Sequence, residues 1–163
     1  MTDPMSRHVN ALEEAKAGAA LLRCCGSRRW AERVLARRPF ASDAALLRVA
    51  EREWWTLERD DWLEAFAAHP RIGEHTGDDW SQREQSGMDA AGSETRRAIA
   101  DGNTTYEQRF GYVFLICAAG RSADEMLAEL RRRLDEDPAS ELRTAAGEQA
   151  KIMRLRLEKL LTP

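Results

Sequence analysis

The chain has 163 residues, 43% of them hydrophobic, which is enough to bury a core without disulfides or metals to hold it. Its 25 Lys and Arg residues are matched by 28 Asp and Glu residues, giving a net charge of −3 and a pI near 5.7. This balance argues against a nucleic-acid or anionic-membrane partner. Arginine is dense at Arg28-Arg29, Arg37-Arg38 and Arg131 to Arg133, and we interpret all three clusters as solvated helix faces.

The cysteines and the start of the sequence bear on the cellular location of the protein. Cys24, Cys25 and Cys117 have no metal-ligand spacing, and adjacent cysteines rarely bridge each other, so a reducing environment is the simplest interpretation. The sequence opens with no hydrophobic leader and contains no apolar run of transmembrane length. We therefore expect a soluble cytoplasmic protein, with residues 1–163 forming one compact domain.

The first third of the chain has the pattern of consecutive helices. Residues 1–6 include Asp-Pro and little that is apolar, which predicts a loose start. Apolar residues recur at helical spacing over 9–23, and Ser27 can cap a second helix over 28–38, which Pro39 ends. Ser42 and Asp43 begin a third helix.

A fourth helix is predicted after Thr56, and it runs straight into His69-Pro70. Proline disfavours the α conformation in the residue before it, so we expect the helix to end at His69. Residues 71–92 lose the periodic pattern, apart from a possible short helix over Trp80 to Gln85. An irregular segment of this length inside a compact domain is more often functional than idle.

The remaining sequence also predicts helices. A short one over 93–100 should be broken by Asp101-Gly102, and a new one should begin at Thr104 and include the apolar run 112–119. A lone strand there would have nothing to pair with, which favours helix. Further helices should follow the caps at Ser122 and Asp137, the last reaching about Leu161. The fold class is therefore all-α, with seven or eight helices.

His69 is the leading candidate for chemistry, because a titratable group at a helix end beside a cleft is commonly put to use. Such a histidine can also do no more than complement the helix dipole. Ser81 and Glu84 are equally ambiguous, because Ser-x-x-Glu is the pattern of a capping box.

Arg156 is more informative than its neighbours. On a helical wheel of residues 152–161 it falls about 60° from the centre of the apolar face, so it points partly inward. A buried guanidinium needs an anionic partner. It could form a structural ion pair with Glu84, or it could hold a carboxylate or ureido group of a substrate.

Two other kinds of site are weakly supported. His69, Glu74, His75, Asp78 and Asp79 carry suitable donors for zinc or manganese, but their spacing fits no helical metal motif. Cys117 lies in an apolar run, where a thiol is more often inert packing than a nucleophile. We therefore expect neither a metal site nor a nucleophilic cysteine.

Several stretches together resemble one known family. They are His69-Pro70-Arg71-Ile72-Gly73-Glu74 with Ser81-x-x-Glu84-Gln85, the segment from Cys24 to Phe40, the run Phe110 to Ser122, and Glu148-Gln149-x-Lys151-Ile152-x-x-Leu155-Arg156-Leu157. In order and spacing they resemble the 2-oxo-4-hydroxy-4-carboxy-5-ureidoimidazoline (OHCU) decarboxylases, which complete the uricase route from urate to allantoin. The resemblance covers most of the chain, from about Leu21 to Leu161.

The resemblance implies an all-helical, cofactor-free homodimer. His69 would be the catalytic histidine, Glu84 the carboxylate beside it and Arg156 the arginine that grips the substrate. The pocket would be lined by Pro70, Ser81, Gln85, Ile116, Cys117, Ala118, Ala119 and Gly120. This chain departs from many relatives at Arg133-Leu134-Asp135-Glu136-Asp137, where they read Arg-Leu-x-Asn-Asp, and in a shorter 71–80 loop.

The chemistry suits these residues, because loss of CO2 leaves a carbanion conjugated with the ring carbonyl and imine of the substrate itself. The protein need only orient the substrate, stabilise charge and deliver a proton to one face, which would give (S)-allantoin. The competing interpretation is a non-enzymatic helical interaction module, in which Arg156 and Glu84 are a structural pair and His69 is a cap.

Overall fold

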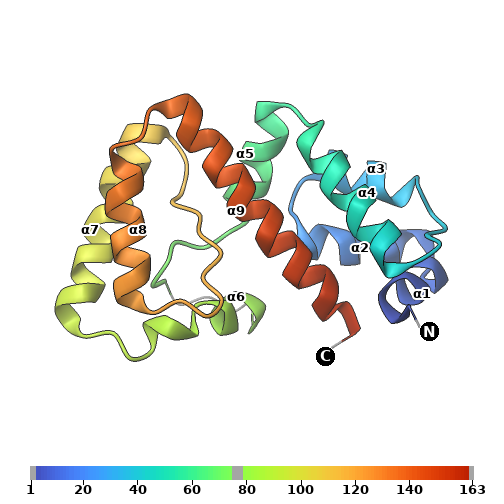
Figure 1. Cartoon of the computed structure of the whole chain (residues 1–163), viewed down its shortest axis with the longest axis horizontal. Coiled ribbons are helices and arrows are strands. Elements are labelled where there is room, and N and C mark those ends of the chain that lie inside the picture. The colour runs from blue at the N-terminus through green and yellow to red at the C-terminus, as the bar shows by residue number, and fades with distance from the viewer. Residues whose placement is uncertain (1–2, 75–78, 162–163) are drawn as a thin grey trace. The chain divides into compact units, whose positions relative to one another are not determined.

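The computed structural model describes residues 3–74 and 79–161. Over these residues the chain forms nine α-helices and two short 3-10 helices, with no strand, which confirms the all-α prediction. In chain order they are α1 (Pro4–Ala11), α2 (Glu14–Cys24), α3 (Arg28–Leu35), α4 (Asp43–Trp55), α5 (Arg59–Ala67), α6 (Asp79–Glu84), η1 (Ser86–Met88), α7 (Ser93–Phe110), α8 (Ala123–Leu134), α9 (Pro138–Glu158) and η2 (Lys159–Leu161) (Figure 1). None of the described helices is long and apolar enough to cross a membrane.

The helices group into two compact units. One unit comprises Met1–Ala65 with Ala150–Pro163, and the other comprises Phe66–Gln149. The chain passes from one unit to the other within α5 and again within α9.

The first unit is organised around tryptophans that pair their indole N–H groups with buried backbone. Trp30 is fully buried and donates to the carbonyl of Ala50 at 2.9 Å, and Trp62 donates to the carbonyl of Trp54 at 3.0 Å. These bonds satisfy the one polar atom of each ring and so allow the rest to contribute apolar burial. Ser27 and Ser42 cap α3 and α4 as predicted, accepting from Trp30 and Ala45.

The beginning of the chain differs from its prediction. Residues 9–23 form parts of two helices rather than one, because Arg38 Nη1 donates to the carbonyls of Val9 (3.0 Å) and Leu12 (2.8 Å) at the end of α1. The expected loose start over 1–6 is also wrong for the residues described. Asp43 accepts from the backbone N–H of Ser6 at 2.7 Å and donates its own to Asp3 at 3.1 Å, and residues 1–2 lie outside the described part.

The second unit is organised around α7 and α8, whose facing side chains form one apolar cluster. Its fully buried members include Tyr106 and Leu130, together with Ile99 and Met126. The predicted break at Asp101-Gly102 is wrong, because α7 continues through it. A Cβ atom at Gly102 would lie 2.5 Å from Leu130 Cδ2, so this glycine allows Leu130 to pack directly against the α7 backbone.

Candidate active site

His69 lies two residues beyond the end of α5, directly before Pro70, where its backbone N–H donates to the carbonyl of Phe66 at 3.1 Å. The helix therefore ends slightly earlier than predicted, and the side chain is half-buried. Its Nε2 atom lies 2.7 Å from Oε1 of Gln149. The ring is thus held in position by a side chain 80 residues away in the sequence.

Gln149 lies on α9 and is fully buried. Its Oε1 faces His69, and its Nε2 has no hydrogen-bond partner among the described residues. A buried amide donor left unpaired lowers the stability of the fold by roughly 1–3 kcal/mol, so such a group in a folded protein often has a functional role. No local sequence signal indicates a role for Gln149, although it stands seven residues before Arg156 and hence on a similar face of the same helix.

Glu148, the residue before Gln149, holds a different part of the site. Its Oε1 accepts the backbone N–H of Cys117 at 3.1 Å and lies 3.9 Å from Nη2 of Arg121. Glu141, Ala145, Glu148 and Gln149 follow the i, i+4, i+7, i+8 spacing of one helix face, and all four are buried. This face of α9 fixes both the His69 ring and the backbone of the 111–120 segment.

The predicted helix over 112–119 is wrong, since these residues form an irregular connection between α7 and α8 (Figure 1). Gly111 ends α7 in the left-handed conformation, with φ +85°, and its N–H donates to Glu107. The connection is held by buried charged side chains rather than by a helix. Arg133 Nη1 donates to the carbonyl of Leu115 at 2.7 Å, and Glu148 accepts from Cys117 two residues later.

Arg133 is fully buried, so its interpretation as part of a solvated helix face is wrong. Its Nε donates to Oε1 of Glu141 at 2.7 Å, and the Tyr106 hydroxyl donates to the same oxygen at 2.6 Å. Burial lowers the pKa of Arg133, but the contact with Glu141 outweighs it and the net shift is upward. Burial, followed by the bond to Glu141, raises the pKa of Tyr106. The guanidinium also lies over the ring of Phe114, 4.7 Å from its centroid.

The segment 116–120 was predicted to line the pocket, and its side chains divide into buried and accessible ones. Ile116 and Ala118 are buried, Cys117 is half-buried, and Ala119 and Gly120 are exposed. Gly120 has φ +76°, which favours glycine at the turn into α8.

Helix α6 confirms the short helix predicted over Trp80 to Gln85, and it carries the predicted site residues Ser81 and Glu84, with Gln85 directly after it. Ser81 is the third residue of α6 and is buried, so the capping-box alternative for Ser81 and Glu84 is wrong, because an N-cap precedes its helix. Glu84 is the last residue of α6 and is half-buried. Gln85 Oε1 accepts the backbone N–H of Gly73 at 3.0 Å and so ties α6 to the turn that follows His69-Pro70.

Arg156 belongs to the other unit. It is 7% exposed, which confirms that it points inward, and its Nη1 donates to the carbonyl of Arg23 at 3.3 Å. Neighbouring Cys25 is buried, and burial raises the pKa of its thiol, so this cysteine stays protonated and unreactive.

The predicted metal donors lie only partly within the described residues. Among the described residues no group of three or more His, Cys, Asp or Glu side chains could hold a metal ion. Glu74 is paired with Arg71 Nη1 at 2.9 Å, while His75 and Asp78 lie outside the described residues.

Comparison with known proteins identifies the class to which this fold and site belong. The sequence profile of the OHCU decarboxylases matches residues 10–158. The chain therefore belongs to the OHCU decarboxylase family. Each stretch that carried the resemblance lies within the matched residues.

Individual relatives agree with this placement. The chain is 33% identical to the OHCU decarboxylase of Haloferax volcanii over 130 residues, covering 78% of this chain and 77% of that one. It is 36% identical over 147 residues to the uric acid degradation bifunctional protein TTL of Arabidopsis thaliana, covering 85% of this chain but only 45% of that longer protein.

Solved structures show the same fold. A crystal structure of an OHCU decarboxylase in the presence of (S)-allantoin superposes with a TM-score of 0.80 at 33% identity, covering 93% of this chain and all of that one. The crystal structure of an (S)-allantoin synthase shares the fold with a TM-score of 0.73 at 18% identity, over 95% of this chain and 53% of that one.

Proposed function

We propose that this protein decarboxylates OHCU to (S)-allantoin and CO2 without a cofactor. Family membership supports the reaction, and the crystallisation of a relative with (S)-allantoin supports the product. The observation that carries the proposal for this chain is the His69 ring, held at 2.7 Å by the buried amide of Gln149.

The bond between the carboxylate and its ring carbon breaks, and CO2 leaves. The electron pair passes into the adjacent imine, so the substrate serves as its own electron sink. The imine nitrogen takes up a proton, and the 4-hydroxyl gives one up as it becomes the ring carbonyl of allantoin. A proton must then reach one face of the ring carbon that bears the ureido group. His69 in its protonated form supplies it, and the resulting neutral imidazole regains a proton from solvent.

Gln149 gives the proton donor its direction. With Oε1 of Gln149 accepting from Nε2–H of His69, the ring is fixed in orientation, and Nδ1 is the atom that delivers the proton to the reacting carbon. The unpaired Nε2 of Gln149 is then available to a substrate oxygen, which accounts for a buried donor without a protein partner.

The roles proposed for the other site residues are supported by the chemical type and the burial of their side chains. Glu84 helps to keep His69 protonated, and the inward-pointing guanidinium of Arg156 holds the carboxylate or ureido end of the substrate. Pro70, Ser81, Gln85 and residues 116–120 line the pocket. Gln85 does so through its Nε2, because its Oε1 is engaged by Gly73.

The experiment that tests the proposal feeds urate through uricase and hydroxyisourate hydrolase, adds this protein, and follows the circular dichroism of the product. We expect faster decay of the last intermediate and optically active allantoin. Unchanged decay and a racemic product would refute the proposal and favour a non-enzymatic helical module. A chelator should leave the rate unchanged.

The resemblance further implies a homodimer, and the cysteine content favours a cytoplasmic location; both remain predictions. Light scattering on the purified chain measures the assembly directly, and a mass of one protomer would contradict the dimer.

A further inference from the structure

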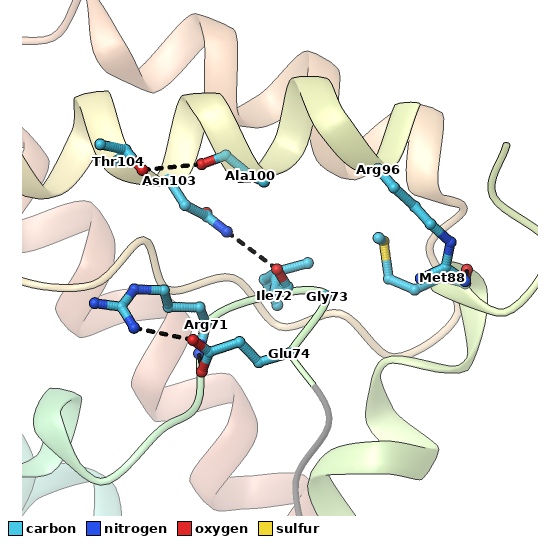
Figure 2. A pocket seen from close by; sticks show the side chains of 9 residues that line it. All are labelled: Arg71, Ile72, Gly73, Glu74, Met88, Arg96, Ala100, Asn103 and Thr104. Carbon is cyan, nitrogen blue, oxygen red and sulfur yellow. Dashed lines mark hydrogen bonds and ion pairs between the residues drawn. The ribbon is translucent and has the colours of Figure 1, made fainter. Parts of the chain in front are cut away.

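A cavity of about 320 Å³ opens in the unit formed by Phe66–Gln149. Its walls are the turn Arg71 to Glu74, Met88 of η1, and one face of α7 (Figure 2). None of its lining residues is among those proposed above for catalysis or substrate binding. The cavity is therefore a separate candidate site.

The α7 wall carries a buried amide with one unused atom. Asn103 is 4% exposed, and Figure 2 shows it projecting from α7 toward Ile72, whose carbonyl accepts its Nδ2 at 3.0 Å. Its Oδ1 is buried and has no hydrogen-bond partner among the described residues. Because Nδ2 is committed to backbone, the amide cannot flip, and it presents an acceptor that only an N–H or O–H donor can satisfy.

The rim carries Arg96, a cation that forms no ion pair with the described residues. Arg96 donates from Nε and Nη2 to the carbonyls of Ala91 and Met88, and among the ion pairs of the described residues none involves it. The other arginine of the cavity, Arg71, is already paired with both Glu74 and Glu107 at 2.9 Å. Arg96 is thus fixed in place by two carbonyls while its charge stays available to an anion.

Apolar atoms lie between these two polar groups. Ile72 and Met88 are both buried and both line the cavity, and Ala100 leaves the α7 wall open between Arg96 and Asn103. A ligand that fits has a hydrogen-bond donor, a short apolar stem and an anionic group.

We propose that this cavity binds a small carboxylic acid bearing an amide or ureido N–H. The N–H donates to Oδ1 of Asn103, the carboxylate pairs with Arg96, and the carbon stem packs on Ile72 and Met88. The site goes beyond the proposed decarboxylation and does not depend on it.

The test uses N-carbamoylglycine as the probe and the Met88 methyl group as the reporter. The chain has five methionines, and Met88 lines the cavity. The 13C-methyl resonance of Met88, assigned by its loss in Met88→Leu, therefore reports ligand binding in the cavity. The resonances of the other methionines serve as references. We expect a saturable shift of this resonance alone as the probe is raised to about 10 mM, which detects a millimolar Kd.

Paired variants separate this site from others. Arg96→Gln should raise the Kd about tenfold, whereas Arg97→Gln, the exposed neighbour that does not line the cavity, should leave it unchanged. Ala100→Phe should abolish the shift by filling the cavity. His69→Ala should preserve it, which distinguishes this site from the proposed active site.

Three results would overturn the inference. They are no shift of the Met88 resonance, an equal shift in Ala100→Phe, and loss of the shift in His69→Ala. Ala100 is exposed, so its replacement should not prevent folding, and circular dichroism of each variant checks this.

Discussion

Nε2 of His69 and Oε1 of Gln149 lie 2.7 Å apart, one side chain half-buried after α5 and the other fully buried on α9. An amide oxygen can only accept, so Nε2 of His69 carries the proton of this bond. The bond therefore holds the imidazole in one orientation.

The first prediction concerns Gln149. Gln149→Leu keeps the volume but removes the acceptor, so we expect kcat to fall on the order of 100-fold with a smaller change in KM. Gln149→Glu places a carboxylate against the imidazole, which favours the protonated ring and raises the pKa of His69. Since the protonated ring is the acid, activity should persist to higher pH in this variant. A pH–rate profile identical to that of the natural protein would remove Gln149 from the mechanism.

The second prediction concerns the proton donor itself. His69→Ala should lower kcat by roughly 100-fold to 10,000-fold, the range typical of a general acid, and Glu84→Ala should lose most activity. Glu58→Ala, at an exposed position in the other unit, is the matched control. All three should keep the natural helical circular dichroism, and full activity in His69→Ala would show that another group supplies the proton.

The site could be predicted only in part. His69 stood out because proline follows it, and Arg156 because of its place on an amphipathic helix, both of which are local signals. The role of Gln149 had no such signal, because a glutamine in a helix is usually solvated and its contact with His69 spans 80 positions. Arg133 was misread for the same reason, since its partner Glu141 makes burial possible and sequence spacing does not show it.

The third prediction concerns the buried group formed by Arg133, Glu141 and Tyr106. Arg133→Met leaves Glu141 charged and buried beside Tyr106, which should lower the free energy of unfolding by about 3–5 kcal/mol. The triple variant Arg133→Met, Glu141→Leu, Tyr106→Phe replaces the whole group with apolar atoms and should recover most of that loss. Urea denaturation measures both, and a triple variant no more stable than Arg133→Met would contradict this assignment.

The fourth prediction uses the cysteines. Cys24 and Cys25 are at most 1% exposed, and burial raises the pKa of the Cys25 thiol, whereas Cys117 is half-buried in the proposed pocket lining. A raised pKa lowers the thiolate fraction at neutral pH. Iodoacetamide should therefore modify Cys117 first, as read by peptide mass spectrometry, and (S)-allantoin should slow it. Modification of Cys25 before Cys117 would contradict the burial.

Most of the fold followed from local signals, since Ser27, Ser42 and Ser122 cap helices where predicted. Both errors in the second half arise from tertiary contacts. The apolar run 112–119 lacks a helix because Arg133 and Glu148 take up its backbone groups. Gly102, a helix breaker by propensity, lies inside α7 because Leu130 occupies the space that a side chain would need.

The last prediction tests that contact. Gly102→Ala improves helix propensity but puts a Cβ atom 2.5 Å from Leu130 Cδ2, so it should lower the free energy of unfolding by roughly 1–3 kcal/mol. Gly147→Ala is the matched control, because Gly147 is also helical and a Cβ there meets nothing within 4 Å. That variant should gain roughly 0.5–1 kcal/mol. Leu130→Ala should cancel the penalty of Gly102→Ala in the double variant, measured as a coupling free energy by urea denaturation. Equal stabilisation by Gly102→Ala and Gly147→Ala would show that α7 and α8 do not depend on this close approach.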